Sequence, residues 1–235
     1  SEEFRDDVTA ELQRLYIDEN PEANRKDLVT IDGNEYYGVV HEQYHPWFRT
    51  FLDERGYHDI FLIDPNGVVV YSVSKESDFG TILLSGPWKD TVLARVFTRS
   101  MDAQVSAFGP VFEDFTTYPP SHDIPSAFLG MPLISRQGKI LGTLVFQIDD
   151  TLLSGLMRHE DAMGMTGESY LVGREGLMRS NSRFENTTTV LSKHVRTRTV
   201  ELAMRGQREV REATNYRNRR VLSAFTPLDF LGTRY

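Results

Sequence analysis

One short segment has the spacing of a zinc-dependent hydrolase. His41 and His45 are four residues apart with Glu42 between them, in the order HEQYH. On a helix this spacing places both imidazoles on one face, where they can ligate zinc while the glutamate acts as a base. The sequence offers no evident third ligand downstream, so a zinc hydrolase is a distant alternative. We expect no metal, no cofactor and no catalytic residue.

The remaining histidines show no such pattern. They are scattered along the chain and are predicted to lie at the surface: His58, His122, His159 and His194.

A second group of reactive side chains follows a predicted β-hairpin. Apolar runs at residues 60–63 and 68–73 flank Asp64-Pro65-Asn66-Gly67, in which Asn-Gly favours a tight turn. The second run alternates in a way that predicts a strand covered on one side only. After it the chain becomes charged and aromatic at residues 74–79. A strand end of this kind is typical of the rim of a binding pocket.

Periodic apolar residues predict the elements around this hairpin. We expect helices at residues 1–17 and 35–55, with Pro46 kinking or restarting the second and Gly56 ending it. A helix beginning at Pro87, capped by Ser85 or Gly86, should follow. Three strands are predicted at residues 111–117, 126–135 and 139–149. This order predicts an α+β fold, in which helices pack on an antiparallel sheet.

The hairpin pattern returns about a hundred residues later. An apolar run at residues 169–173, a turn at 174–176 and a strand from 177 repeat the first hairpin. A connecting helix is predicted at 150–163 and a further helix at 190–205, ended by Gly206. Strands at 209–215 and 219–226 follow, so that, by analogy with the first copy, a fifth strand is missing. We expect an N-terminal helix and connection at 1–34 and two tandem modules at 35–150 and 151–235.

Composition narrows the function. The 235-residue chain has a formal net charge of −8 and a pI of about 5.3, which argues against nucleic acid as a partner. It has no cysteine, which excludes disulfides and thiolate chemistry. No run of about 18 apolar residues predicts a membrane span within it. The chain begins at Ser1 inside a helical pattern, as expected of a piece cut from a longer protein.

Five segments of the chain resemble a known domain family. Residues 44–81, 86–97, 115–133, 138–149 and 164–184 together resemble the double Cache domain, a tandem of PAS-like modules on a long helix. The most specific piece is TGESYLVG at residues 166–173. The double Cache domain is the extracytoplasmic sensor of bacterial transmembrane receptors, most often methyl-accepting chemotaxis proteins. Histidine kinases, nucleotide cyclases and diguanylate cyclases carry related regions and are the alternative.

The resemblance implies a periplasmic ligand sensor and not an enzyme. Membrane segments outside this chain would anchor it, and a small molecule would bind the membrane-distal module. The amphipathic helices at the start predict a homodimer. Amino acids, carboxylates and amines are the ligand classes considered. Relatives that bind amino acids carry an Arg two residues before the Trp; here Gly86 precedes Trp88, so those roles are not carried over.

Candidate ligand-binding residues lie at the ends of the central strands of the first module and on the segments over them. They are Tyr71, Ser72, Lys75, Asp78, Trp88, Asp114, Tyr118, Ser121, Phe128 and Gln147. Asp78 and Asp114 can accept from a cationic ligand such as an amine, and Lys75 can meet a carboxylate.

Each candidate also has a purely structural interpretation. Tyr71, Trp88 and Phe128 can serve in core packing. The charged run at residues 75–78 can be a solvated loop, and Asp114 can face water.

Overall fold

The computed structural model describes residues 9–31, 35–102, 104, 109–158 and 163–235. It divides into two compact units. The first contains Ser1–Glu113 and Thr117–Ile148, and the second contains Asp114–Thr116 and Asp149–Tyr235. Each unit is described by itself. No helix among the described residues is both long enough and apolar enough to cross a membrane.

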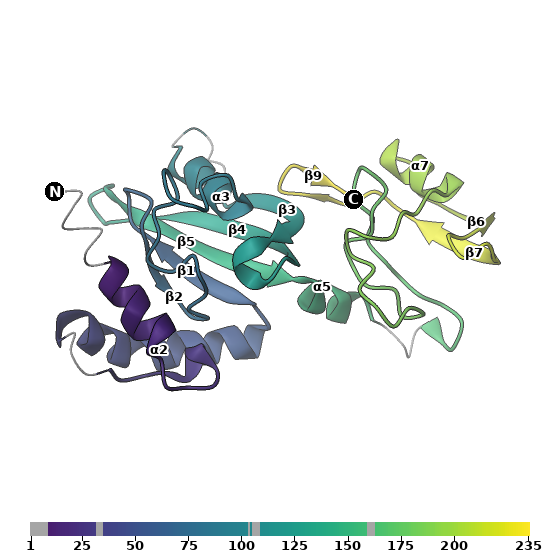
Figure 1. Ribbon diagram of the computed structural model, residues 1–235. Helices are drawn as coiled ribbons and strands as arrows, with labels where there is room; N and C mark the ends of the chain where they lie inside the picture. Colours follow the sequence, from purple (N-terminus) through teal and green to yellow (C-terminus); the bar gives the residue numbers. More distant parts are fainter. Residues whose placement is uncertain (1–8, 32–34, 103, 105–108, 159–162) are drawn as a thin grey trace. The chain divides into compact units, whose positions relative to one another are not determined.

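The first unit is built on a five-stranded antiparallel sheet (Figure 1). Its strands are β1 (Asp59–Ile63), β2 (Val69–Ser72), β3 (Val111–Tyr118), β4 (Ile124–Ile134) and β5 (Ile140–Asp149). The order across the sheet is β2-β1-β5-β4-β3, so β1 and β5 lie at its centre. The α+β fold predicted from the sequence is confirmed, as are the first hairpin and the three later strands.

Two helices cover opposite faces of this sheet. Phe48, Phe51 and Leu52 of α2 (Glu35–Arg55) pack against Ile60, Tyr71 and other side chains of one face. Helix α3 (Val92–Met101) buries its apolar residues on the other face, against Phe61 and Phe128 among others. β2 is buried at Val69, Tyr71 and Ser72 but exposed at Val70, so the face that Val70 and Ser72 share is only partly covered, where the alternation predicts a strand covered on one side only.

Prolines affect these helices less than predicted. α2 runs through Pro46 without interruption, and Gly56 ends it in the left-handed region at φ 72°. α3 does not begin at Pro87. Thr91 is its N-cap, and the Thr91 hydroxyl accepts from the amide of Ala94.

The N-terminal helix is only partly described. Residues 1–8 of the predicted helix lie outside the described residues. Residues 9–13 are α-helical and continue into the π-helical turn η1 (Arg14–Asp18). A second short turn, η2 (Arg25–Asp27), follows it. Leu12, Leu15 and Tyr16 form a separate small core with Leu28 and Phe79.

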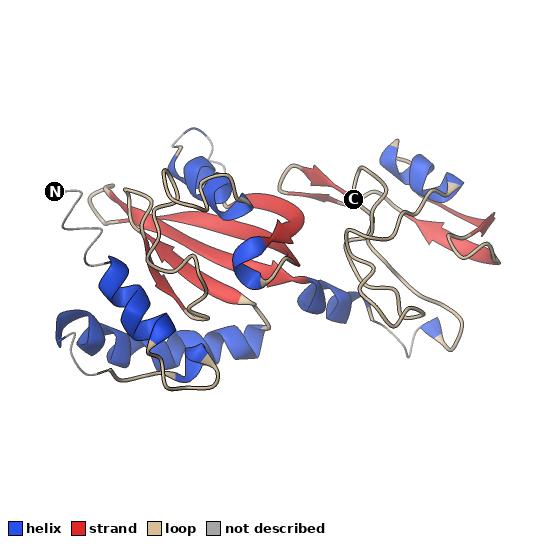
Figure 2. Ribbon diagram, in the orientation of Figure 1, coloured by secondary structure: helices blue, strands red, loops and turns tan. Residues whose placement is uncertain are grey.

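The second unit has less regular structure, with long loops (Figure 2). Its elements are α5 (Asp150–Met157), α7 (Arg198–Met204), β6 (Glu209–Thr214), β7 (Arg220–Phe225), β8 (Asp229–Phe230) and β9 (Thr233–Arg234). β6 pairs with β7 and β8 with β9, each as a two-stranded sheet. The predicted connecting helix ends at Met157, before residues 159–162, which are not described.

Two sequence predictions in the second unit need correction. The hairpin at 169–180 forms only the isolated bridge Val172↔Met178. The helix predicted at 190–205 is confined to Arg198–Met204, because residues 190–197 return along the hairpin through the bridge Leu177↔His194. Val195 is buried by this pairing, and tertiary contact outweighs helical periodicity.

Candidate functional site

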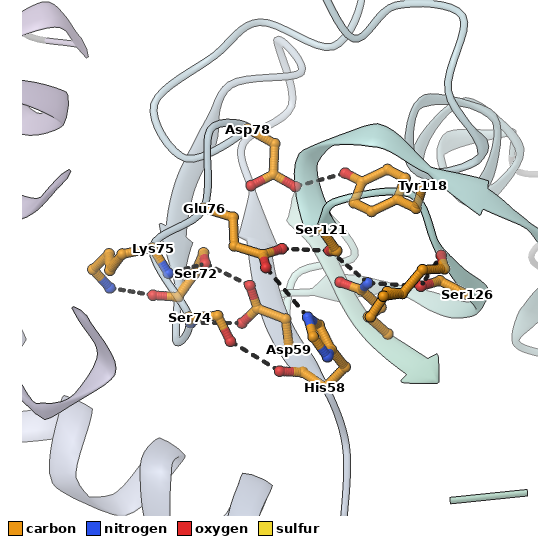
Figure 3. Close-up of polar contacts among 12 residues, drawn as sticks. His58, Asp59, Ser72, Ser74, Lys75, Glu76, Asp78, Tyr118, Ser121 and Ser126 are labelled. Carbon is orange, nitrogen blue, oxygen red and sulfur yellow. Dashed lines mark hydrogen bonds and ion pairs between the residues drawn. The ribbon is translucent and has the colours of Figure 1, made fainter. Parts of the chain in front are cut away.

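Strand ends bring a buried polar network together at one edge of the first unit (Figure 3). Asp59, at the start of β1, lies opposite Gln147 of β5 in the sheet register. Its carboxylate accepts from the Ser72 hydroxyl at 2.6 Å and from the amides of Val73 and Ser74 at 2.8 and 3.0 Å. The carboxylate therefore fixes the turn by which the chain leaves β2. Burial raises the pKa of Asp59.

Asp78 lies beside this turn and is fully buried. Its Oδ2 accepts from the Tyr118 hydroxyl at 2.5 Å, at the end of β3. Its Oδ1 has no hydrogen-bond partner among the described residues. Burial raises the pKa of Asp78 to about 8, with a further contribution from the charge of Asp59.

A chain of hydrogen bonds connects Glu76 to the central strand β5. The Ser121 hydroxyl donates to Glu76, and Nε2 of Gln147 donates to the hydroxyls of Ser121 and Ser126 at 2.9 Å each. Nε2 of His58 lies 3.3 Å from Oε1 of Glu76. Oε1 of Gln147 is buried and has no partner in the described part of the chain. His58 is thus half-buried against Glu76 and not at the surface as predicted.

Lys75 is also fully buried, but its amine faces rings. Its Nζ donates to the carbonyl of Ser72 and lies 4.3 Å from the ring centroid of Tyr71 and 5.0 Å from that of Phe79. Burial lowers the pKa of Lys75 to about 7, against the pull of Asp59. The interpretation of residues 75–78 as a solvated loop is wrong for Lys75 and Asp78. The Lys75 amine meets aromatic rings and a carbonyl.

The two histidines of the HEQYH segment are structural. Their rings stack at 4.2 Å. Both nitrogens of His45 are engaged, Nδ1 with the Tyr71 hydroxyl at 2.7 Å and Nε2 with the carbonyl of Lys26 at 2.8 Å. Burial lowers the pKa of His41 to about 3 and that of His45 to about 4, so both rings are neutral. Glu42 is exposed, and no metal-binding cluster of three such residues occurs in the described ranges. This arrangement does not support a zinc hydrolase.

The ten predicted site residues divide into three groups. Ser72, Asp78, Tyr118, Ser121 and Gln147 meet in the polar network. The others of the first unit flank it. The Trp88 indole donates to the carbonyl of Ser77 at 3.1 Å, the Phe128 ring lies 4.8 Å from that of Tyr118, and Tyr71 and Lys75 lie toward α2.

Asp114 does not join this group. It pairs with Arg179 at 2.9 Å and accepts from the Tyr235 hydroxyl at 2.6 Å, inside the second unit. The structure thus does not bring Asp114 to the polar network, and its carboxylate is half-buried in an ion pair instead of facing water.

The comparisons with known proteins rest on structure. No protein-family model matches the sequence, and no curated protein matches it. The extracellular domain of the protein vpHK1S-Z8 aligns with 99% of this chain and 82% of its own length, at 12% identity and a TM-score of 0.52. The periplasmic sensory domain of the Campylobacter jejuni chemoreceptor Tlp1 aligns over 97% and 89%, at 11% identity and a TM-score of 0.50.

A third structure is larger. An extracellular ligand-binding receptor from Desulfohalobium retbaense aligns with 98% of this chain at 13% identity and a TM-score of 0.50, but the match covers 38% of that receptor. The fold is similar to that of extracytoplasmic sensory domains. The α+β fold implied by the double Cache resemblance is confirmed.

Within this sensory-domain fold, sequence reasoning missed two carboxylates. Asp59 opens a buried strand and Glu76 lies in a charged run, and both positions look solvent-exposed when read locally. A signal did exist for Asp59. A carboxylate directly before the buried residues 60–63 needs donors, and the serines at 72 and 74 supply a hydroxyl and an amide.

Proposed function

We propose that the first unit is the small-molecule-sensing module of a transmembrane receptor of the chemoreceptor type. The fold it shares with a chemoreceptor sensory domain and a ligand-binding receptor supports this function. The ligand would bind at the polar network around Asp78 and Gln147. Its binding would favour one of two arrangements of the domain, and that bias would pass to an output region outside this chain.

The observation that carries this proposal is a pair of unsatisfied acceptors. Asp78 Oδ1 and Gln147 Oε1 are buried and have no donor among the described residues. A buried polar atom without a partner costs about 1–3 kcal/mol. A ligand that donates hydrogen bonds to both atoms removes this cost, so the site is suited to a ligand with several donors.

The acidic groups of the network favour a protonated amine as the ligand. The carboxyls of Asp59, Glu76 and Asp78 belong to the network, whereas the amine of Lys75 faces rings. The pKa of Asp78 is raised to about 8, so its carboxyl holds a proton at pH 7. An ammonium group beside it would lower that pKa and pair with the carboxylate, whereas an anionic ligand would raise it further. Amines and amino acids are the favoured ligands, with the ammonium placed against Asp78.

A thermal-shift screen tests this function directly. The panel holds amines, amino acids, dicarboxylates and purines, each added to the 235-residue chain and to two variants. Asp78→Asn removes the ionisable carboxyl at the site, and Asp90→Asn makes the same substitution at an exposed aspartate. A ligand at a hundred times its Kd stabilises the protein by roughly 2.7 kcal/mol.

We expect an amine-bearing ligand to stabilise the parent and Asp90→Asn equally. Asp78→Asn should lose at least tenfold in affinity, which corresponds to about 1.4 kcal/mol. A ligand that stabilises all three proteins alike would move the site away from Asp78. Stabilisation by dicarboxylates alone would contradict the ligand class.

The proposed function also predicts the cellular location of this region. This region would lie in the periplasm, held by membrane segments outside the chain. An alkaline phosphatase fusion to this region in the full-length protein should be active. A cytoplasmic location, with the fusion inactive, would contradict it.

A stripe on α2 supports a homodimer. Tyr36, Val40, Tyr44 and Trp47 follow helical spacing, and between 47% and 88% of each side chain is exposed. A second copy of the chain would cover this face. Sedimentation should show a dimer for the parent and a monomer for the double variant Tyr44→Glu, Trp47→Glu. A monomeric parent at millimolar concentration would refute the dimer.

A further inference from the structure

The two parts of the chain carry opposite net charge. Residues 1–148 hold 12 Arg and Lys against 23 Asp and Glu, whereas residues 149–235 hold 14 against 11. The excess of positive charge is thus confined to the part that forms the second unit, although the whole chain is acidic. An asymmetry of this kind indicates an anionic partner for the basic part.

Arginines concentrate around α7 and the β6–β7 hairpin. Eight of them are exposed, and we call them the arginine surface: Arg196, Arg198, Arg205, Arg208, Arg211, Arg217, Arg219 and Arg220. Three form ion pairs with Glu201, Glu209 and Glu212. The other five have no carboxylate within 4.0 Å in the described part of the chain, so their charge is available to a partner.

Part of the arginine surface borders an open pocket of about 580 Å³. His194, Arg196, Arg198 and Arg211 line it, together with residues of the β6–β7 turn. Its one acidic lining residue, Glu212, already pairs with Arg220 at 2.6 Å. Guanidinium groups bind phosphate oxygens through paired hydrogen bonds, so the pocket is suited to a phosphate group.

Two exposed apolar side chains share a face of the hairpin with Arg220. The register pairs Val210 with Ala224, Glu212 with Leu222 and Thr214 with Arg220, which places Val210, Leu222 and Arg220 on one face, whereas Arg211, paired with Ser223, lies on the other. Val210 is 62% exposed and Leu222 75%. Apolar side chains beside arginines gain free energy at a lipid interface, because the chains enter the acyl boundary while the arginines meet headgroups. The backbone of a nucleic acid offers phosphates to the arginines but no apolar phase to Val210 and Leu222.

We propose that the second unit docks on an anionic phospholipid surface through its arginine surface, with Val210 and Leu222 entering the interface. This inference rests on the proposed function, since it requires the region to lie beside a membrane. It gives the second unit a role distinct from ligand binding by the first.

Vesicle flotation with the 235-residue chain tests the proposal. One set of vesicles contains phosphatidylglycerol and phosphatidylcholine, and the other phosphatidylcholine alone. The test variant carries Arg196→Glu, Arg208→Glu and Arg219→Glu, three exposed arginines that form no ion pair with another described residue. The control carries Lys89→Glu, Arg136→Glu and Lys139→Glu, which change the net charge equally on exposed positions of the first unit. Circular dichroism checks that both variants fold.

We expect the parent and the control to bind only the anionic vesicles, with affinity falling as salt rises. The test variant should bind roughly 100-fold more weakly or worse, since each arginine near the surface contributes about 1 kcal/mol. No binding of the parent at low salt, or an equal loss in both variants, would overturn the proposal. Tighter binding to single-stranded DNA than to vesicles, or salt-sensitive self-association without lipid, would overturn it too.

Inorganic phosphate separates a lipid surface from a discrete anion site. If phosphate releases the protein no better than chloride at equal ionic strength, the docking surface is supported. Release by phosphate alone would assign the pocket to a free anion and overturn the proposal. The ligand screen tests Asp78 of the first unit, whereas vesicle flotation tests the arginine surface of the second. A negative result in one experiment therefore does not affect the conclusion from the other.

Discussion

Residues 64–83 of the first unit and residues 173–195 of the second follow the same backbone path. Each begins with a turn closed by a glycine, Gly67 at φ 85° and Gly176 at φ 83°. In the first unit, backbone amides donate from Asp64 to Val68, from Gly67 to Asp64, from Val69 to Thr81 and from Leu83 to Gly67. The second unit repeats these bonds from Gly173 to Leu177, from Gly176 to Gly173, from Met178 to Lys193 and from Val195 to Gly176. The two hairpins are therefore one structural repeat.

The units differ in the carboxylates that the repeat positions. In the first unit Tyr118 donates to Asp78, whose second oxygen has no partner among the described residues. In the second unit Tyr216 donates to Glu168 at 2.7 Å, and the Ser182 hydroxyl donates to the other oxygen at 3.0 Å. The second network satisfies both oxygens of its carboxylate and the first does not. One backbone motif thus supports a site with spare acceptors in one unit and a closed structural network in the other.

Removing the central carboxylate of each network should give the largest difference between the units in lost stability. Asp59 is fully buried and accepts from three amides and one hydroxyl. Asp59→Ala removes this acceptor from all four donors, of which the Val73 amide keeps a longer bond to the carbonyl of Ile60 at 3.3 Å. We expect it to lower the free energy of unfolding by roughly 3–5 kcal/mol. Glu168→Ala frees only two hydroxyls in a half-buried setting and should cost about 1–2 kcal/mol. Urea unfolding measures both.

Asp59→Asn is the matched control, since it keeps one acceptor oxygen. It should fall between the parent and Asp59→Ala. Equal losses for Asp59→Ala and Glu168→Ala would mean that the two networks contribute equally to stability. The units would then not differ in this respect.

The two turn glycines give a finer comparison. Alanine at either position must adopt the left-handed region, at a cost of about 1–2 kcal/mol. A Cβ on Gly67 would also lie 3.0 Å from Cγ of Leu84 and 3.3 Å from Cε1 of Phe97, whereas the nearest atom to one on Gly176 is 3.7 Å away. Gly67→Ala should therefore lose roughly 1 kcal/mol more than Gly176→Ala. Thermal unfolding measures the loss in both variants. A larger loss for Gly176→Ala than for Gly67→Ala would show that the second turn is the more constrained.

Local signals explain which parts of the fold could be predicted. Asn66-Gly67 and the alternating run after it set the first hairpin, because turn chemistry and strand period both act within a few residues. Residues 190–197 show the limit. Their apolar spacing is helical, yet residues 190–192 form a turn with Leu191 at φ 58°, and residues 193–195 bond to Gly176 and Met178. That pairing is tertiary, and no local pattern encodes it.

The candidate site shows the same limit of prediction from local sequence. Ser72, Tyr118 and Gln147 could be grouped because each lies at or near the end of a predicted strand of the same module. Asp114 could not be placed, since its partner Arg179 is 65 residues away and belongs to the second unit. The unsatisfied oxygen of Asp78 likewise depends on how the first unit packs around it, and no local sequence pattern predicts it.

The last difference between the units is a pH dependence confined to the first. The pKa of Asp78 is about 8 in the folded state against an ordinary value of 3.8. Between these values the folded protein holds a proton that the unfolded chain has released, so stability falls as pH rises from about 4 to 8. Lys75 acts in the opposite direction. Its folded pKa of about 7 lies below the ordinary 10.5, so stability rises again above pH 7.

The histidines act against Asp78 below pH 6.5, because the pKa values of His41 and His45 are lowered to about 3 and 4 and stability rises with pH over that range. The contribution of Asp78 is therefore read from the difference between Asp78→Asn and the parent. The melting temperature of Asp78→Asn should gain on that of the parent as pH rises from about 4 to 8, while the rise due to Lys75 above pH 7 stays in both. Asp90→Asn, at an exposed position, should retain the profile of the parent. If Asp78→Asn also retains it, Asp78 is ionised in the folded protein across this range. An ionised Asp78 must then hold a donor of its own, and the open acceptor that distinguishes the first unit from the second would be filled.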